Sequence, residues 1–201
     1  DEWLLDVPGA AAMVFGDKLR LGAAQVMRIA QGLYERGYIT YMRTDNVSLS
    51  DEALAAVRAE VKRSYGDKFL SPGPRQFANK VKNAQEAHEA IRPTTPLRSP
   101  DSLAHELNGQ ELSLYRLIWQ RTLASQMADA AGTTVSVRLA ATTFEGAAGT
   151  ECEFAASGTT IAFAGYRQVY VESSDESEST DEDKEALLPV LEVGEAVPVA
   201  E

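Results

Sequence analysis

The stretch from Gly37 to Ser50 reads GYITYMRTDNVSLS, and its centre, YMRTD at residues 41–45, decides how the rest of the chain is interpreted. Successive side chains of an extended segment alternate between two faces. Tyr41 and Arg43 should therefore share one side, with Met42 turned away from them. A glycine opens the stretch and serines close it, which is typical of a connection between two helices. The stretch therefore predicts that the side chains of Tyr41 and Arg43 lie on the same face of the chain.

A phenol beside a guanidinium is suited to attack on a phosphodiester. A phenol alone is a weak nucleophile at neutral pH, because its ordinary pKa is ~10. A nearby guanidinium lowers the cost of forming a phenolate and binds two phosphate oxygens in a fork. Such a pair can leave a covalent phosphotyrosine. On three residues alone, however, the commoner meaning is a short strand with a half-buried tyrosine and an arginine that caps another element.

The residues on either side predict two amphipathic helices. Residues 22–36 carry one apolar stripe, so we expect all of its members, the last tyrosine included, to lie in the core: Val26, Met27, Ala30, Leu33 and Tyr34. Gly37 is a natural stop. Ser48 or Ser50 can cap the second helix, which should end near Tyr65. The basic residues of this second helix face either DNA or solvent: Arg58, Lys62 and Arg63.

Two separated pieces of the sequence resemble one family of enzymes. Residues 31–35, QGLYE, and, after a short spacer, residues 39–45, ITYMRTD, are similar to the active-site tyrosine motif of the bacterial type IA DNA topoisomerases. Residues 83–93, NAQEAHEAIRP, resemble the histidine-bearing stretch of that family. The two pieces stand in the family's order and at about its spacing. The similarity continues more loosely through residues 112–128 and the strands that follow.

The resemblance implies roles for six residues. Tyr41 would be the catalytic nucleophile and Arg43 would hold the phosphate. The implied DNA contacts are Thr44, Asp45, His88 and Arg92. An imidazole titrates near physiological pH and can donate to a phosphate oxygen or be held by a carboxylate such as that of Asp45. For Arg92 two interpretations stay open: it grips phosphate, or it only caps the segment before Pro93.

The distribution of charge is compatible with a DNA-binding face on an acidic chain. The net charge is −11 over 201 residues. Residues 20–98, which hold both motifs, carry 13 Lys and Arg against 8 Asp and Glu, a net charge of +5. Exposed charges more than ~10 Å apart are largely screened at 0.1 M salt, so the acidic remainder does not forbid phosphate binding.

Several classes of protein are made improbable by composition. No apolar run approaches the ~20 residues of a membrane span, and the acidic start DEWLLD is no secretory signal. Cys152 is alone, so an internal disulfide and a cysteine metal cluster are excluded. Two histidines make a histidine metal site, and hence a relaxase, improbable. A tyrosine recombinase would need several Arg and His residues around its tyrosine in another order.

The pattern along the chain predicts an α+β protein. Residues 1–19 are a lead-in, residues 20–127 a helical domain with the tyrosine, and residues 128–201 a β-rich domain with a flexible acidic loop at 172–186. Within the helical part, Asp101 or Ser102 begins a short helix that Asn108-Gly109 ends, and residues 112–128 form the longest helix, with Trp119 in the core. Short strands are expected at Thr133–Leu139, Cys152–Phe154, Ile161–Phe163 and Val169–Val171, and a final β segment at Leu187–Val199.

The resemblance also implies a layout and a reaction. The β-rich part would be half of the arch of a toroidal enzyme, and the chain would be an internal fragment. Such an enzyme is an isomerase that cleaves and religates single-stranded DNA through a 5′-phosphotyrosine and relaxes negative supercoils without ATP. The Mg²⁺ of the full enzyme would be held by carboxylates of an upstream domain, with none bound by this chain. We then expect the isolated chain to be inactive, able to self-associate through exposed apolar patches, and located in the cytoplasm at the bacterial nucleoid.

One departure from the family supports a second hypothesis. The apolar segment AAMVFG begins at residue 11, and residues 10–15 stand where the family has a polar segment close to DNA. This favours a non-catalytic DNA-binding or interaction module derived from the family. The set of Tyr41, Arg43 and His88 opposes that hypothesis.

Overall fold

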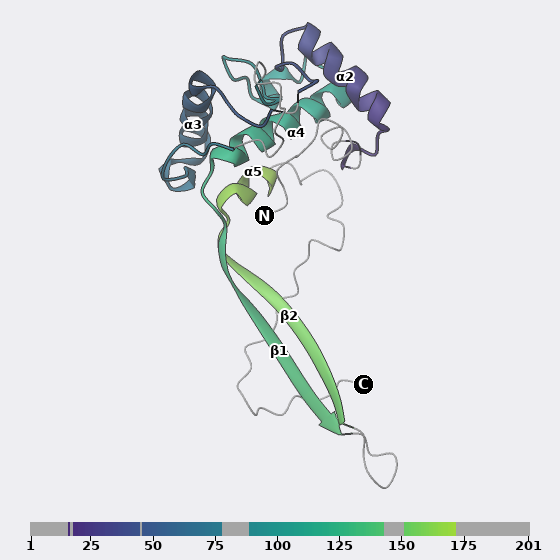
Figure 1. Ribbon diagram of the computed structural model, residues 1–201, viewed down its shortest axis with the longest axis vertical. Coiled ribbons are helices and arrows are strands. Elements are labelled where there is room, and N and C mark those ends of the chain that lie inside the picture. The colour runs from purple at the N-terminus through teal and green to yellow at the C-terminus, as the bar shows by residue number, and fades with distance from the viewer. Residues whose placement is uncertain (1–15, 17, 45, 78–88, 143–150, 172–201) are drawn as a thin grey trace. The chain divides into compact units, whose positions relative to one another are not determined.

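The computed structural model describes residues 16, 18–44, 46–77, 89–142 and 151–171. It divides into two units, one of residues 1–129 with 165–172 and one of residues 130–164 with 173–201. The described part of the first unit is helical, and that of the second is a pair of antiparallel strands (Figure 1). The α+β class predicted from the sequence is therefore confirmed. The division differs from the predicted boundary at 128 in one segment, residues 165–172, which belongs with the helices.

In the helical unit, α4 (Gly109–Gln126) contacts both α2 (Ala23–Glu35) and α3 (Asp51–Tyr65) (Figure 1). Shorter elements complete this unit: η1 (Asp67–Phe69), η2 (Pro100–Leu103), η3 (Gly165–Arg167) and α5 (Gln168–Val171). The core between them is apolar and includes Leu33, Ile39, Val61, Leu103, Leu114, Tyr115, Ile118, Trp119, Leu123 and Met127. Trp119 is 8% exposed, so its predicted place in the core is confirmed.

Side-chain caps explain where α3 and α4 begin. The Ser50 hydroxyl accepts the Ala53 N–H at 3.4 Å at the start of α3, as one of the two predicted caps would. Asn108 and Glu111 form a capping box at the start of α4, with bonds of 3.0 and 3.1 Å. The prediction that Asn108-Gly109 ends the preceding helix was therefore wrong. An asparagine that can accept the backbone N–H three residues later starts a helix at least as readily as it stops one.

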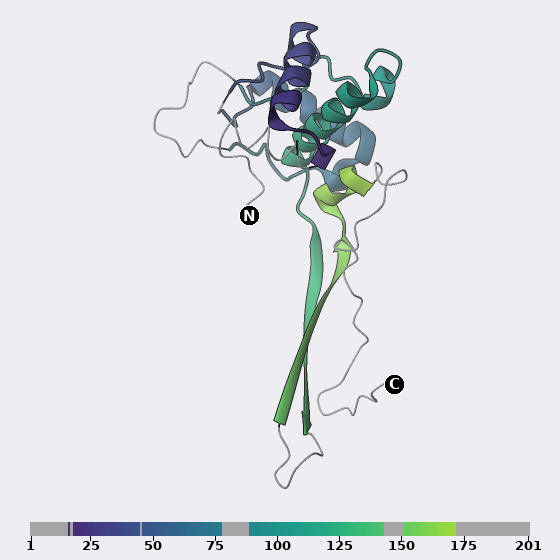
Figure 2. The ribbon, with the colours of Figure 1, turned by 90° about the vertical axis from the view of Figure 1, so that its right-hand side faces the viewer.

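The second unit contains one long hairpin. Strand β1 (Ala131–Thr142) pairs antiparallel with β2 (Glu151–Phe163), with Leu139 opposite Phe154, and in Figure 2 the two twisted strands cross each other in the view. Two short strands were expected where β2 is continuous. Gly158 lies opposite Val135 inside the ladder. Pairing with an equally long partner strand outweighs the weak strand preference of that glycine.

Residues 168–171 were expected to extend a strand, and they form α5 instead. Val169 is 1% exposed, and its carbonyl accepts a hydrogen bond from Gln120 Nε2 on α4 at 3.0 Å. Four residues with two valines are too short for periodicity to separate helix from strand. Contact with α4 decides the outcome.

Some predicted features lie outside the described residues. These are the lead-in up to residue 15, the acidic loop at 172–186 and the β segment after it. Within the described ranges, no helix is both long and apolar enough to cross a membrane.

Candidate active site

A tight turn at the end of α2 directs the chain into the Tyr41 stretch. The Gly37 N–H donates to the Tyr34 carbonyl and the Tyr38 N–H donates to the Leu33 carbonyl, both at 2.9 Å. Gly37 has φ +76°, in the left-handed region that favours glycine. This pair of bonds is the Schellman arrangement, which satisfies the last carbonyls of a helix. The turn fixes the direction in which residues 38–41 leave the helix.

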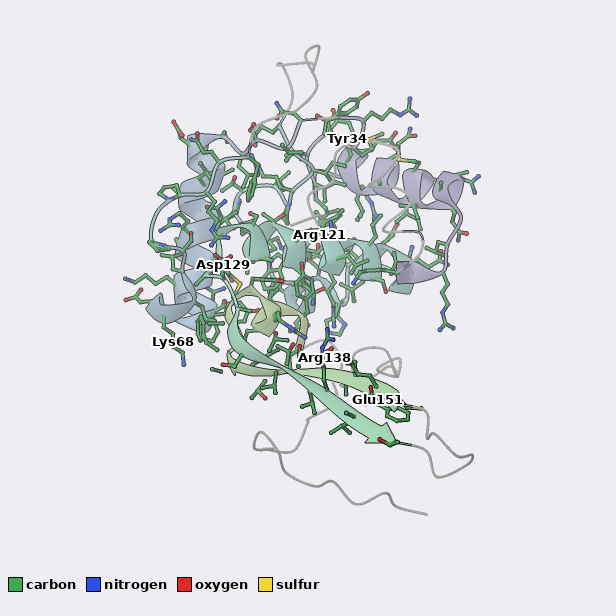
Figure 3. All side chains as sticks on the ribbon, turned by 60° about the horizontal axis from the view of Figure 1, so that its bottom comes forward. Tyr34, Lys68, Arg121, Asp129, Arg138 and Glu151 are labelled. Atoms are coloured by element: carbon green, nitrogen blue, oxygen red, sulfur yellow. The ribbon has the colours of Figure 1, made fainter. Side chains whose placement is uncertain are left out.

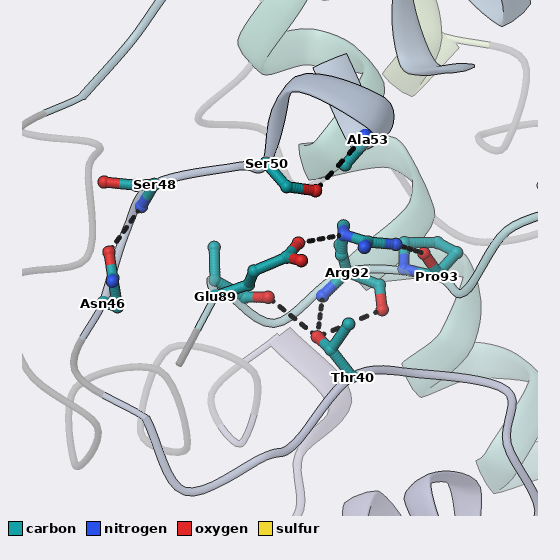
Figure 4. A network of polar contacts seen from close by, with 9 residues as sticks. Thr40, Asn46, Ser48, Ser50, Ala53, Glu89, Arg92 and Pro93 are labelled. Carbon is teal, nitrogen blue, oxygen red and sulfur yellow. Dashed lines mark hydrogen bonds and ion pairs between the residues drawn. The ribbon is translucent and has the colours of Figure 1, made fainter. Parts of the chain in front are cut away.

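Residues 38–40 pair with residues 92–94, at the end of the second motif. The Thr40 N–H donates to the Arg92 carbonyl at 2.9 Å, and the Thr94 N–H donates to the Tyr38 carbonyl at 3.1 Å. The Thr40 hydroxyl donates to the Ala90 carbonyl at 2.7 Å (Figure 4). Ile39 and Pro93 face each other in an antiparallel bridge. The structure therefore brings the two motifs together, although some fifty residues separate them in sequence.

The Tyr41 stretch has the alternating faces that its sequence predicts. Met42 is 5% exposed and belongs to the core. Tyr41 is half-buried, with one side against the core. Arg43 is exposed and forms no ion pair with another described residue. A guanidinium that is not committed within the described parts of the chain is available to an anionic ligand.

Thr44 is placed differently from Arg43. It is 6% exposed, and its hydroxyl accepts the Asn46 N–H at 3.1 Å. The Asn46 side chain then accepts the Ser48 N–H at 2.8 Å (Figure 4). These local bonds hold the loop between the Tyr41 stretch and α3. They give Thr44 a structural role, and its contact with DNA stays a prediction.

Arg92 is buried and committed within the chain. Its side chain is 10% exposed, with Nε donating to Glu89 Oε2 at 2.7 Å and Nη1 donating to the Pro93 carbonyl at 2.9 Å (Figure 4). The hydrogen bond from Arg92 is the main cause that holds the pKa of the Glu89 carboxyl below its ordinary 4.5. This geometry favours the second of the two interpretations of Arg92, in which it holds the segment before Pro93.

Replacing Arg92 by Ala should lower the free energy of unfolding of the chain by about 1–2 kcal/mol, because two charge-assisted hydrogen bonds are lost. Urea unfolding measures the change. Since the pKa of Glu89 is lower in the folded state, the difference should be complete above pH 4.5 and fade as the pH falls below it.

The control for this prediction is Arg138→Ala. Arg138 also pairs with a glutamate, Glu153, but the two side chains are 77% and 59% exposed, so the change should be small. Unchanged unfolding of Arg92→Ala together with weaker binding of single-stranded DNA would instead make Arg92 a DNA contact.

Asp45 and His88 lie outside the described residues. The nearest described neighbours of His88 are Glu89 and Ala90, whose N–H donates to the Ser48 carbonyl at 2.9 Å. The roles of Asp45 and His88 stay predictions.

Sequence reasoning missed the environment of Tyr34. It was expected in the core, but it is 41% exposed, and Figure 3 labels it at the end of α2. Its ring lies edge-to-face with the ring of Tyr41, with centroids 5.3 Å apart and planes at 71°. Tyr34 stands at the edge of the apolar stripe, between the exposed residues Gln31 and Glu35. This position at the edge of the stripe was the one feature of the sequence from which the exposure of Tyr34 could have been predicted.

A second missed feature holds the strand before Tyr41 from the other side. The Tyr38 hydroxyl donates to Glu106 Oε2 at 3.0 Å, and this bond is the main cause that raises the pKa of Tyr38. The Arg36 guanidinium lies 5.3 Å from the centre of the Tyr38 ring, and its Nη2 is 2.6 Å from Glu111. Glu106, Glu111 at the start of α4 and the 92–94 segment thus all contribute to the position of residues 38–40, which lead to Tyr41.

The basic residues of α3 are paired within the chain. Arg58 donates to Ser71 and Gly73, Lys62 lies 2.9 Å from Asp67, and Arg63 lies 2.6 Å from Glu60. Of the two interpretations offered for these residues, a DNA-facing strip and an ordinary solvated face, the pairing favours the second.

The described residues do not fit a magnesium site. They contain no group of three or more His, Cys, Asp or Glu side chains that could hold a metal ion.

Comparisons with known proteins agree with these motifs. A family model described as DNA topoisomerase matches residues 14–201. The chain is 49% identical over 187 residues to DNA topoisomerase 1 of Mycobacterium leprae and 52% identical over 179 residues to that of Synechococcus elongatus. These matches cover 92% and 89% of the chain and 19% of each relative.

A solved structure shows the same fold. Full-length topoisomerase I from Thermotoga maritima superposes with a TM-score of 0.66 at 28% identity, over 92% of this chain and 28% of that one. The Tyr-x-Arg stretch and its paired second motif agree with these matches to the DNA topoisomerase family. The chain belongs to the bacterial type IA DNA topoisomerases. It spans about a fifth of the length of the two relatives.

Proposed function

We propose that this chain carries the nucleophile of a DNA topoisomerase that cleaves and religates single-stranded DNA. The observation that supports this most is the placement of Tyr41 and Arg43. They follow a strand held by the Gly37 turn on one side and by residues 92–94 on the other. The side chain of Arg43, two residues after Tyr41, is exposed. A nucleophile on a well-anchored strand, next to an available guanidinium, suits attack on a phosphodiester.

The proposed step is a transesterification. The phenolic oxygen of Tyr41 attacks a backbone phosphorus, the bond from phosphorus to the 3′ oxygen breaks, and the tyrosine becomes joined to the 5′ phosphate. The phenol loses its proton and the departing 3′ oxygen gains one. Arg43 holds the non-bridging phosphate oxygens, whose negative charge grows in the transition state. Religation is the reverse step, and because the phosphotyrosine stores the bond energy, no ATP is needed.

The wider activity of the full-length protein is part of the same proposal. We infer that it relaxes negatively supercoiled DNA, that its domains form a toroid, and that it acts in the bacterial cytoplasm at the nucleoid. We also infer that Mg²⁺ assists the full enzyme from ligands outside this chain, and that the isolated chain does not relax supercoils.

A label-transfer experiment tests the polarity of the linkage. The full-length protein is mixed with a single-stranded oligonucleotide labelled at its 3′ end and is stopped with denaturant. The label should migrate with the protein, and peptide mapping should place it on Tyr41. An oligonucleotide labelled at its 5′ end is the control and should release its label as a free fragment. Transfer of the 5′ label instead would contradict the proposal.

The second candidate function is a DNA-binding or interaction module without cleavage. The apolar residues 10–15, which stand where the family has a polar segment, favour it. The same label transfer separates the two, because a binding module would shift the oligonucleotide on a native gel and leave no adduct after denaturation.

The hairpin supports the proposal that the isolated chain self-associates. Val135, Leu139 and Phe154 share one face of the ladder and are 46%, 37% and 60% exposed. An apolar face of this kind favours contact with another surface. Sedimentation of the isolated chain over a range of concentrations would show dimers or larger species.

A further inference from the structure

Tyr34 is an exposed aromatic residue whose position core packing does not explain. Its neighbours on the stripe, Val26, Ala30 and Leu33, are at most 6% exposed, whereas Tyr34 is 41% exposed. Its ring nevertheless has a defined partner, because it meets the ring of Tyr41 at 5.3 Å and 71°. These values lie in the range of favourable edge-to-face pairs of aromatic rings.

The backbone holds both members of this pair in place. Tyr34 belongs to the last turn of α2, and its own carbonyl accepts the Gly37 N–H in the turn that ends the helix. Tyr41 follows a strand that is bonded to Arg92 and Thr94. The contact between the rings is therefore made by two anchored segments that lie seven residues apart along the chain.

We propose that Tyr34 is a positioning residue for Tyr41. A half-buried tyrosine at an open site can rotate about its side-chain bonds, and only some rotamers aim its oxygen at a phosphate. The Tyr34 ring occupies space that other rotamers of Tyr41 would need, and it stabilises the rotamer seen here. A group held close to its attack geometry reacts faster than one that must find it. The contact uses the ring of Tyr34, so its hydroxyl is dispensable. This inference rests on the proposed function of Tyr41.

Single-turnover cleavage by the full-length protein tests this inference, at saturating single-stranded oligonucleotide. Tyr34→Ala should slow formation of the covalent adduct roughly threefold to tenfold, which corresponds to the strength of an aromatic pair. Tyr34→Phe, which keeps the ring, should restore the wild-type rate. The dissociation constant of the oligonucleotide should be the same for all three proteins, because Tyr34 acts on the nucleophile and not on binding.

Two controls separate positioning from a loss of fold. Tyr166→Ala removes an equally exposed aromatic ring, at 38%, from η3 and should leave the rate unchanged. If Tyr34→Ala does not fold, Tyr34→Leu gives the same test, because leucine keeps helix propensity and bulk without a ring. Thermal unfolding of each variant checks its fold.

The outcomes of these experiments distinguish the positioning role of Tyr34 from the proposed function of Tyr41 as the nucleophile. A wild-type protein that forms no adduct at Tyr41 overturns both. A wild-type protein that forms the adduct, with Tyr34→Ala cleaving at the same rate or faster, overturns the positioning role alone. A slow Tyr34→Phe variant would also overturn it, because the hydroxyl would then be the active group.

Discussion

Replacing Tyr41 by Phe in the full-length protein should abolish the covalent DNA adduct. The substitution removes the one oxygen that can bond to phosphorus, so the expected loss is complete within detection. The ring stays, and with it the packing against the core and the edge contact with Tyr34. We therefore expect the fold and the affinity for single-stranded DNA to be preserved. The measurement is label transfer to protein from a 3′-labelled oligonucleotide after denaturation.

The control is Tyr166→Phe, which removes the phenolic oxygen of a tyrosine that is 38% exposed elsewhere in the helical unit. It should form the adduct at the wild-type rate. An adduct that persisted in Tyr41→Phe would refute the assignment of the nucleophile. Relaxation of supercoiled DNA should disappear together with the adduct, because strand passage needs the break.

Arg43→Ala should slow cleavage by about 10²–10³-fold, the usual effect of removing one donor that stabilises transition-state charge. The side chain is exposed and has no ion pair with another described residue, so thermal unfolding should not change. Binding of single-stranded DNA, followed by anisotropy at two salt concentrations, should weaken, and the salt slope should fall by about one. Arg43→Lys should recover binding more than cleavage, because an ammonium keeps the charge but lacks the planar fork.

Arg28→Ala is the control for this second prediction. Arg28 is also an exposed arginine, on α2, outside the Tyr41 stretch. Its removal should leave the rate of cleavage unchanged. If Arg43→Ala cleaved as fast as the wild type, another group would hold the phosphate. The proposed catalytic role of Arg43 would then be refuted.

Local rules were sufficient for much of the helical unit. The range of α3 and the Ser50 cap follow from an apolar stripe with acidic residues in its first turn. The end of α2 follows from Gly37. The burial of Met42 between a half-buried Tyr41 and an exposed Arg43 agrees with the alternation expected of an extended segment, although the chain bends at residues 42 and 43. In each case the deciding interaction lies within a few residues of the position it explains.

The predictions that were wrong concern positions whose contacts in the fold a local sequence pattern does not show. The sequence pattern predicted a strand at Val169, but residues 168–171 form a helix that contacts α4. The apolar stripe predicted that Tyr34 lies in the core, but its side chain is exposed and its ring contacts that of Tyr41. The partner of Val169 lies 49 residues away and meets it only after folding. Tyr34 and Tyr41 are close in sequence, but the turn at Gly37 decides that their rings meet, and the apolar pattern does not show this.

The sequence by itself determined the family, the Tyr41/Arg43 pair and the boundaries of the main helices, because motif chemistry and helix caps are short-range properties. Only the tertiary structure decided that residues 38–40 pair with residues 92–94, which places the two motifs side by side. It also decided which polar side chains remain available after the internal bonds are made. The physical reason for the pairing is that backbone groups must find hydrogen-bond partners, and those of residues 38–40 lie some fifty residues away along the chain.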